Sequence, residues 1–180
     1  MVTRHRSAGH AAQARGRFVA GHTASPRSSD HFTAVVDGRS FQATESEAFE
    51  IDFFGVNLLF IAGCASSATD TTCIEFLLPA TAQTGTYELG SCDSCSAQGL
   101  YVTKPDAFWF TDSVNVGTLT ITSIERPDGK LGSVQGVFSF DAFNDSTGTV
   151  VQVRSGDFSV SGLVDAVSAT TWTDIKKRYR

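Results

Sequence analysis

Histidine is scarce in this sequence and is confined to its beginning. All four histidines precede or open the first stretch that reads as a β-strand, and they are His5, His10, His22 and His31. A Ser-His-Asp triad, a Cys-His dyad and an imidazole metal site all need histidine inside the folded part of the chain. The sequence therefore argues against histidine-dependent chemistry in the predicted domain.

Acidic residues are absent from residues 1–29, which carry five arginines. The whole chain has a formal net charge of −5, so the remainder, with 19 acids against nine lysines and arginines, stands at −10. Binding to phosphates needs a basic face, and we therefore expect no nucleic-acid partner.

Long apolar runs are also missing, and we expect no transmembrane segment. Residues 1–30 have no apolar period and too little hydrophobic surface to fold alone, which predicts a disordered lead. We expect a β domain over residues 31–163 and a C-terminal tail over residues 164–180. In the tail, Trp172, Ile175 and Tyr179 lie at helical spacing, which favours a short helix packed on the domain over a partner-binding tail.

Methionine occurs once, whereas phenylalanine occurs 14 times, and aromatic residues favour strands. From Phe32 onward, short alternating segments are separated by turn signals. The expected strands cover residues 32–36, 39–43, 48–54, 58–63, 73–78, 86–89, 99–103, 107–111, 117–124, 131–142, 149–154 and 158–162. The first two meet across Asp37-Gly38, a strong hairpin signal, whereas Ser155-Gly156-Asp157 is expected to separate the last two. About ten such strands predict an all-β, mainly antiparallel β-sandwich, with a closed β-barrel as the alternative.

The four cysteines form the most informative polar set. Cys64 follows one expected strand and Cys73 opens the next, so these two residues face each other if the strands are antiparallel neighbours. That pairing leaves Cys92 with Cys95. Two disulfides are favoured over a single zinc site with all four thiolates, because zinc ribbons carry two close knuckles and only Cys92 and Cys95 make one. No other metal and no cofactor is expected.

Aromatic residues near the middle of the chain form a candidate ligand-stacking platform. Tyr101 and Trp109 are the candidate stacking residues, with Phe108 and Phe110 beside them. On a strand, Phe108 and Phe110 share one face and Trp109 points to the other. We expect the two phenylalanines in the core, and either a ligand-facing or a cross-strand role for Trp109.

Carboxylates near the expected strand ends offer an enzymatic alternative. Paired acids perform glycoside hydrolysis, and the available ones are Glu45, Glu47, Glu50, Asp52, Asp141 and Asp145. Acids at such positions also solubilise any sheet protein, so the sequence favours a protein that is not an enzyme. A carbohydrate-active hydrolase and a carrier of a small apolar ligand are the alternatives to a binding or scaffolding module.

Four phrases carry a resemblance to a known family. They are "FTAVVDGRSFQA", "GTYEL", "GTLTITSIE" and "VQGVFSFDAFNDSTGTVVQVRSGDFSV", in that order over residues 32–160. They resemble a family of small Bacteroidetes envelope lipoproteins known only as a domain of unknown function. The resemblance implies an extracytoplasmic protein and no assigned reaction, although no signal peptide is visible in this chain. The sequence leaves a carbohydrate and a protein both open as the ligand, and it leaves the oligomeric state undefined.

Overall fold

The computed structural model describes residues 30–53, 55–67, 70–90, 97–103 and 107–162, and this part of the chain is almost entirely β-strand. The strands are β1 (His31–Val36), β2 (Arg39–Gln42), β3 (Glu45–Phe53), β4 (Val56–Ser66), β5 (Thr71–Pro79), β6 (Gly85–Leu89), β7 (Gln98–Thr103), β8 (Ala107–Phe110), β9 (Gly117–Glu125), β10 (Ser133–Asn144) and β11 (Thr149–Ser161). A short 3-10 helix, η1 (Pro127–Gly129), lies between β9 and β10.

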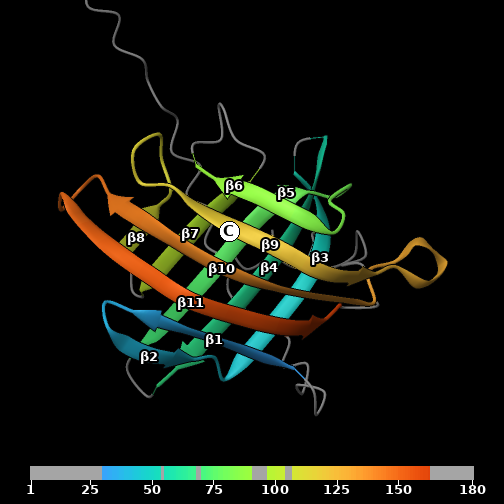
Figure 1. Cartoon of the computed structure of the whole chain (residues 1–180), viewed down its shortest axis with the longest axis horizontal. Helices are drawn as coiled ribbons and strands as arrows, with labels where there is room; N and C mark the ends of the chain where they lie inside the picture. The colour runs from blue at the N-terminus through green and yellow to red at the C-terminus, as the bar shows by residue number, and fades with distance from the viewer. Residues whose placement is uncertain (1–29, 54, 68–69, 91–96, 104–106, 163–180) are drawn as a thin grey trace, which may run out of the picture.

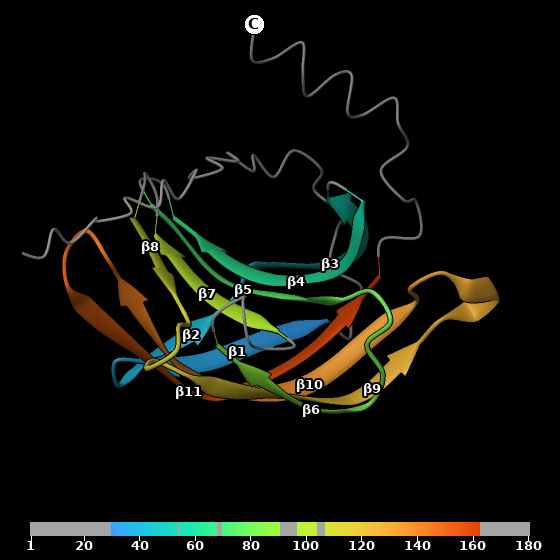
Figure 2. The ribbon, with the colours of Figure 1, turned by 90° about the horizontal axis from the view of Figure 1, so that it is seen from above.

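The strands form one curled sheet in the order β2-β1-β11-β10-β8-β7-β5-β4-β3, with β9 paired to β10 and β6 paired to β9. Each of these strand pairs is antiparallel. Figures 1 and 2 show the sheet folded over on itself into two layers. The β4 layer contains β3, β4, β5, β7 and β8, and the β10 layer contains β1, β2, β6, β9, β10 and β11. The predicted all-β antiparallel class is confirmed, and the curled sheet is a half-barrel.

Two junctions connect the layers. On one side, β8 pairs with β7 along its length and with β10 through the single pair Phe110 and Phe143. On the other side, the chain passes directly from β2 to β3. There the backbone N–H of Ala43 donates to Phe32 and that of Thr44 donates to Cys64, at 2.9 and 2.8 Å. The core lies between the two layers and is bounded by these junctions.

The predicted hairpin between β1 and β2 is confirmed. Asp37 and Gly38 both adopt positive φ, at 48° and 78°, as a tight two-residue turn requires. The expected break at Ser155-Gly156-Asp157 is wrong, because β11 continues through it. Ser155 has a φ of 50°, and the pairing with β10 shifts there by a bulge, which lets one strand bend without ending.

Phenylalanine rings fill the centre of the core. Six buried rings belong to this cluster, namely Phe32, Phe41, Phe76, Phe138, Phe140 and Phe158. Phe76 of β5 contacts rings of β1, β10 and β11, with a closest centroid distance of 4.9 Å to Phe138. A Cβ atom added at Gly156 would lie 2.3 Å from the Phe138 ring, so the ring can pack there only because residue 156 has no side chain. Packing this dense joins the two layers into one core.

The two ends of the described body lie side by side. Asp30 accepts hydrogen bonds from the backbone N–H and the hydroxyl of Ser161, and His31 pairs with Ser159 in the ladder between β1 and β11. Of the predicted lead over residues 1–30, only Asp30 is described, and it is bonded to the body; residues 1–29 and the predicted C-terminal helix lie outside the described residues. In the part of the chain that is described, no helix is long and apolar enough to cross a membrane.

Candidate functional site

The outer face of the β4 layer, the side turned away from the β10 layer, carries side chains in rows across the strands. Strand pairing places each row opposite its neighbours. Two of the rows are Glu45, Cys64, Cys73, Val102 and Phe108, and Glu47, Ala62, Glu75, Leu100 and Phe110. Each row therefore runs from an acid on β3 to a phenylalanine on β8. The outer face is acidic at one end and aromatic at the other.

The aromatic end is exposed. Phe108 and Phe110 are 43 % and 39 % exposed, and their rings are nearly parallel, with centroids 6.2 Å apart and an interplanar angle of 15°. The row continues from Phe110 to half-buried Phe143 on β10 and to Val150 on β11, which is 46 % exposed. We call these four residues the Phe108 strip. The expectation that Phe108 and Phe110 belong to the core is wrong.

Tyr101 and Trp109 occupy the opposite face of the same two strands. They are directly paired, are half-buried, and pack against the main core, with ring centroids 5.6 Å apart. The indole N–H of Trp109 donates to the hydroxyl of Thr149 at 3.0 Å, which fixes the ring at the junction of the layers. The structure therefore brings the two candidate stacking residues together, but on the inner side of the strand.

A disulfide joins two of the predicted cysteines. Cys64 and Cys73 pair across β4 and β5 with a Cα separation of 4.1 Å, and the predicted pairing of these two cysteines is confirmed. The disulfide lies beside Leu77, Leu100 and Val102 in a second apolar cluster on the outer face. Cys92 and Cys95 lie outside the described residues. Among the described residues, no group of three metal-binding side chains is found.

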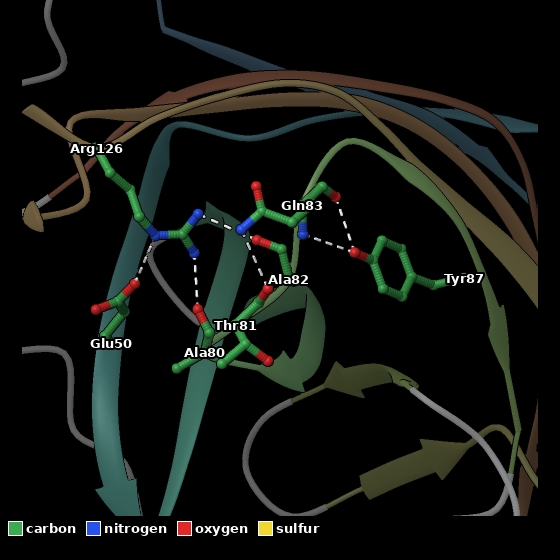
Figure 3. Close-up of polar contacts among 7 residues, drawn as sticks. All are labelled: Glu50, Ala80, Thr81, Ala82, Gln83, Tyr87 and Arg126. Carbon is green, nitrogen blue, oxygen red and sulfur yellow. Dashed lines mark hydrogen bonds and ion pairs between the residues drawn. The ribbon is translucent and has the colours of Figure 1, made fainter.

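An arginine links the two layers at the end opposite the Phe108 strip. Arg126, at the end of β9, donates to the backbone carbonyls of Ala80 and Ala82 at 2.8 and 3.1 Å and pairs with Glu50 at 3.1 Å (Figure 3). The hydroxyl of Tyr87 accepts a hydrogen bond from the backbone N–H of Gln83 and donates one to its carbonyl, each at 2.8 Å. This polar cluster fixes the segment after β5 and gives Glu50 a structural partner. Sequence reasoning missed Arg126, because an arginine after a strand gives no signal of a partner 46 residues away.

The remaining candidate carboxylates do not gather in one place. Asp141 pairs with Arg154 on the β10 layer, and Asp52 accepts from the backbone N–H of Gly55 in the turn after β3. Glu45 and Glu47 share the outer face of β3, two residues apart. Burial, and then the nearby charge of Glu45, raise the pKa of Glu47. Among the described carboxylates, Glu47 is the one whose pKa is raised, whereas the pKa of Asp112 is lowered.

A shallow groove of about 420 Å³ lies on the outer face of the β10 layer. Its polar lining comes from Thr118, Thr120, Ser139, Ser155 and Asp157, beside Val137. Asp157 contacts the imidazole of His31, so the carboxylate in this groove already has a partner. The groove is open and largely neutral, and the charged group in its lining is the Asp157 carboxylate, which is paired with His31.

The fold and its outer face define a nearly all-β half-barrel domain with an exposed aromatic strip. The chain matches the family described as Domain of unknown function (DUF6252) over residues 28–160, and it belongs to that family. No curated protein and no solved structure matches the chain.

Proposed function

We propose that this domain is a non-catalytic, extracytoplasmic binding module that holds a protein partner on the Phe108 strip. The observation that carries the proposal is the pair of exposed, nearly parallel rings of Phe108 and Phe110. Large apolar side chains are rarely left in contiguous exposed patches on a soluble domain unless something binds there. Aromatic side chains that become buried on binding supply much of the free energy of protein interfaces.

The surroundings of the strip indicate the chemistry of the partner. The neighbours of Phe108 and Phe110 on β7 are Val102 and Leu100, so the apolar surface extends inward from the exposed rings. Sugars need several hydrogen-bonding groups directly beside a stacking ring, whereas the cross-strand neighbours of these two rings on β7 are aliphatic. A protein segment with apolar anchors fits the strip better than a glycan does.

Acidic residues border the strip. Glu75 lies opposite Leu100 in the row, Asp112 follows β8, and Asp145 follows β10. Burial acts to raise the pKa of Asp112, but hydrogen bonds from the backbone and side chain of Asn115 and from the backbone of Val114 outweigh it, and the pKa is lowered. Asp112 therefore stays ionised over a wide pH range. A partner with basic residues around its apolar anchors matches this border.

The disulfide and the family resemblance support an extracytoplasmic compartment as part of the proposal. Disulfides such as Cys64 to Cys73 persist in oxidising compartments and are rare in the cytosol. The resemblance to envelope lipoproteins points in the same direction, and we propose a cell-envelope location for the domain.

A displayed peptide library tests the binding surface. Dodecapeptides on phage are selected on the wild-type protein and counter-selected on the Phe108→Ser/Phe110→Ser variant. We expect peptides with apolar anchors and flanking lysine or arginine that bind the double variant at least tenfold more weakly. Val114→Ser is the matched control, because Val114 is also exposed but lies in the loop after β8. Selected peptides that bind the wild type and the double variant equally well would contradict the proposal. Binding to a glycan array that depends on the strip would also contradict it.

A further inference from the structure

The acidic end of the outer face combines apolar and acidic side chains. Phe49, Phe60 and Leu77 form one row across β3, β4 and β5, with the rings of Phe49 and Phe60 5.0 Å apart. The next row begins with Glu47 and Ala62. Phe60 is only 9 % exposed and Ala62 only 2 % exposed, although both point away from the core between the layers. Phe49 and Leu77 on either side of Phe60 are only half-buried, so this row still offers apolar surface to an occupant.

The shape of the layer suits an occupant. Figure 2 shows the β4 layer curved so that its outer face is concave, and no described strand lies over it. Glu45 and Glu47 stand next to the apolar row, and burial followed by the charge of Glu45 raises the pKa of Glu47. Cations brought to this pair would relieve the repulsion between the two carboxylates. The face therefore matches a segment that is apolar on one side and basic at one end.

The chain leaves the described body beside this face. Gly162 forms a bridge to Ala48 in the middle of β3, and its N–H donates to Gly132 at 2.8 Å. The residues on either side of Ala48 are Glu47 and Phe49, whose side chains lie on the outer face. Residues 163–180 thus begin next to the acidic and apolar rows.

Residues 163–180 have the complementary chemistry. Trp172, Ile175 and Tyr179 are spaced for one side of a helix, and the last five residues contain four cations, Lys176, Lys177, Arg178 and Arg180. Trp172 lies ten positions after Gly162, and an extended chain of that length spans up to about 35 Å. Three strands are only about 10 Å across, so the segment reaches every row.

We propose that the outer face of β3, β4 and β5 is the docking site of residues 163–180 of the same chain. The apolar side chains of the segment cover Phe49, Phe60 and Leu77, and its cations lie beside Glu45 and Glu47. A second copy of the body fits less well, because residues 30–180 carry a net charge of −10 and two acidic faces would meet. The inference goes beyond the proposed function, because this end of the face is separate from the Phe108 strip.

Tryptophan fluorescence of the full chain tests the docking. The protein has two tryptophans, so Trp109→Phe leaves Trp172 as the only one. We expect an acrylamide quenching constant for Trp172 at least threefold lower than in the urea-unfolded protein. Adding Glu45→Lys/Glu47→Lys should raise the constant at least twofold, and Phe49→Ser should do the same in a second variant. The matched control is Glu88→Lys, an exposed charge reversal on β6 of the other layer, which should leave the constant unchanged. Far-UV circular dichroism confirms that each variant is folded.

Each other outcome overturns the proposal. Quenching as strong as in the unfolded protein would show that the segment does not dock. If the β3 variants leave the quenching constant of Trp172 unchanged, the segment docks elsewhere. If the constant falls as the protein concentration rises, the segment docks on a second copy of the chain. If Trp172 is open to acrylamide while a synthetic lysine-rich amphipathic peptide binds the face, the occupant is a foreign basic partner.

Discussion

Phenylalanines on the two sides of the β4 layer have opposite surroundings. Phe76 on β5 is fully buried and contacts four other rings, whereas Phe110 on β8 is 39 % exposed. Both residues alternate with neighbours that face the other way, as the pleat of a strand requires. The difference arises because the other layer covers the inner face alone. Both residues are phenylalanines, so residue type does not determine whether they are buried. The side of the β4 layer on which the second layer packs determines it.

Truncating the two rings gives the largest contrast. Phe76→Ala should lower the free energy of unfolding by about 3 to 5 kcal/mol, because it opens a cavity among rings that cannot collapse around it. Phe110→Ala should lower it by less than about 1 kcal/mol, as expected at an exposed position. Urea denaturation measures both. Equal losses would mean that the outer face is a second core.

Removing the disulfide tests what stabilises the outer face. The bridge closes a loop of nine residues in sequence separation, so Cys64→Ser/Cys73→Ser should lower the free energy of unfolding by about 2 to 3 kcal/mol. Reduction of the wild-type protein should produce a similar loss, and the double variant should respond much less to the reductant. Identical urea midpoints for wild type and variant would show that the strand pairing alone holds this face.

Arg126 tests the polar contact between the layers. Arg126→Gln should lower the free energy of unfolding by about 1.5 to 2 kcal/mol, because a half-buried guanidinium and two backbone carbonyls lose charge-assisted hydrogen bonds. Glu50→Gln is the control, and it should have less than half this effect, since the carbonyl contacts remain. If Glu50→Gln is as damaging, the ion pair and not the carbonyl contacts joins the layers.

The pH dependence of Glu47 gives the smallest expected effect. Its folded pKa is raised above the ordinary value of 4.5, so the folded state binds the proton more tightly than the unfolded state does. Stability contributed by this proton is present below pH 4.5 and is lost as the pH rises through the folded pKa. In about 1 M salt, which screens the cations of residues 176–180 but leaves the burial of Glu47 unchanged, Glu47→Gln should therefore gain melting temperature relative to wild type as the pH rises from 4.5 to 7. If the melting-temperature difference between Glu47→Gln and wild type shrinks over this pH range, the pKa of Glu47 is lowered and not raised by folding.

The parts of the fold that depend on local chemistry could be predicted from the sequence. Asp37-Gly38 specifies its turn through positive φ, and Cys64 and Cys73 meet because the strands that carry them are neighbours. The continuous β11 could not be predicted, because Ser155-Gly156-Asp157 reads as a turn and becomes a bulge only when β10 pairs on both sides of it.

The candidate site depended more on tertiary structure. Alternation places Phe108 and Phe110 on one face and Trp109 on the other, but it does not say which face turns inward. That choice follows from the position of β8 at the junction with β10, where Trp109 reaches Thr149. The partners of Arg126 likewise come from strands far away in the sequence. Such contacts exist only after both layers are assembled.

The neighbouring ends of the body determine how it would respond to mechanical load. Asp30 and Ser161 are hydrogen-bonded, and the two strands that end there, β1 and β11, run antiparallel. A force pulling the chain ends apart would therefore act across the ladder at its terminal rung. The bonds between β1 and β11 would open one after another, as in a zipper, and would not resist together in shear. A body anchored through one end and pulled through the other would yield first at this strand pair.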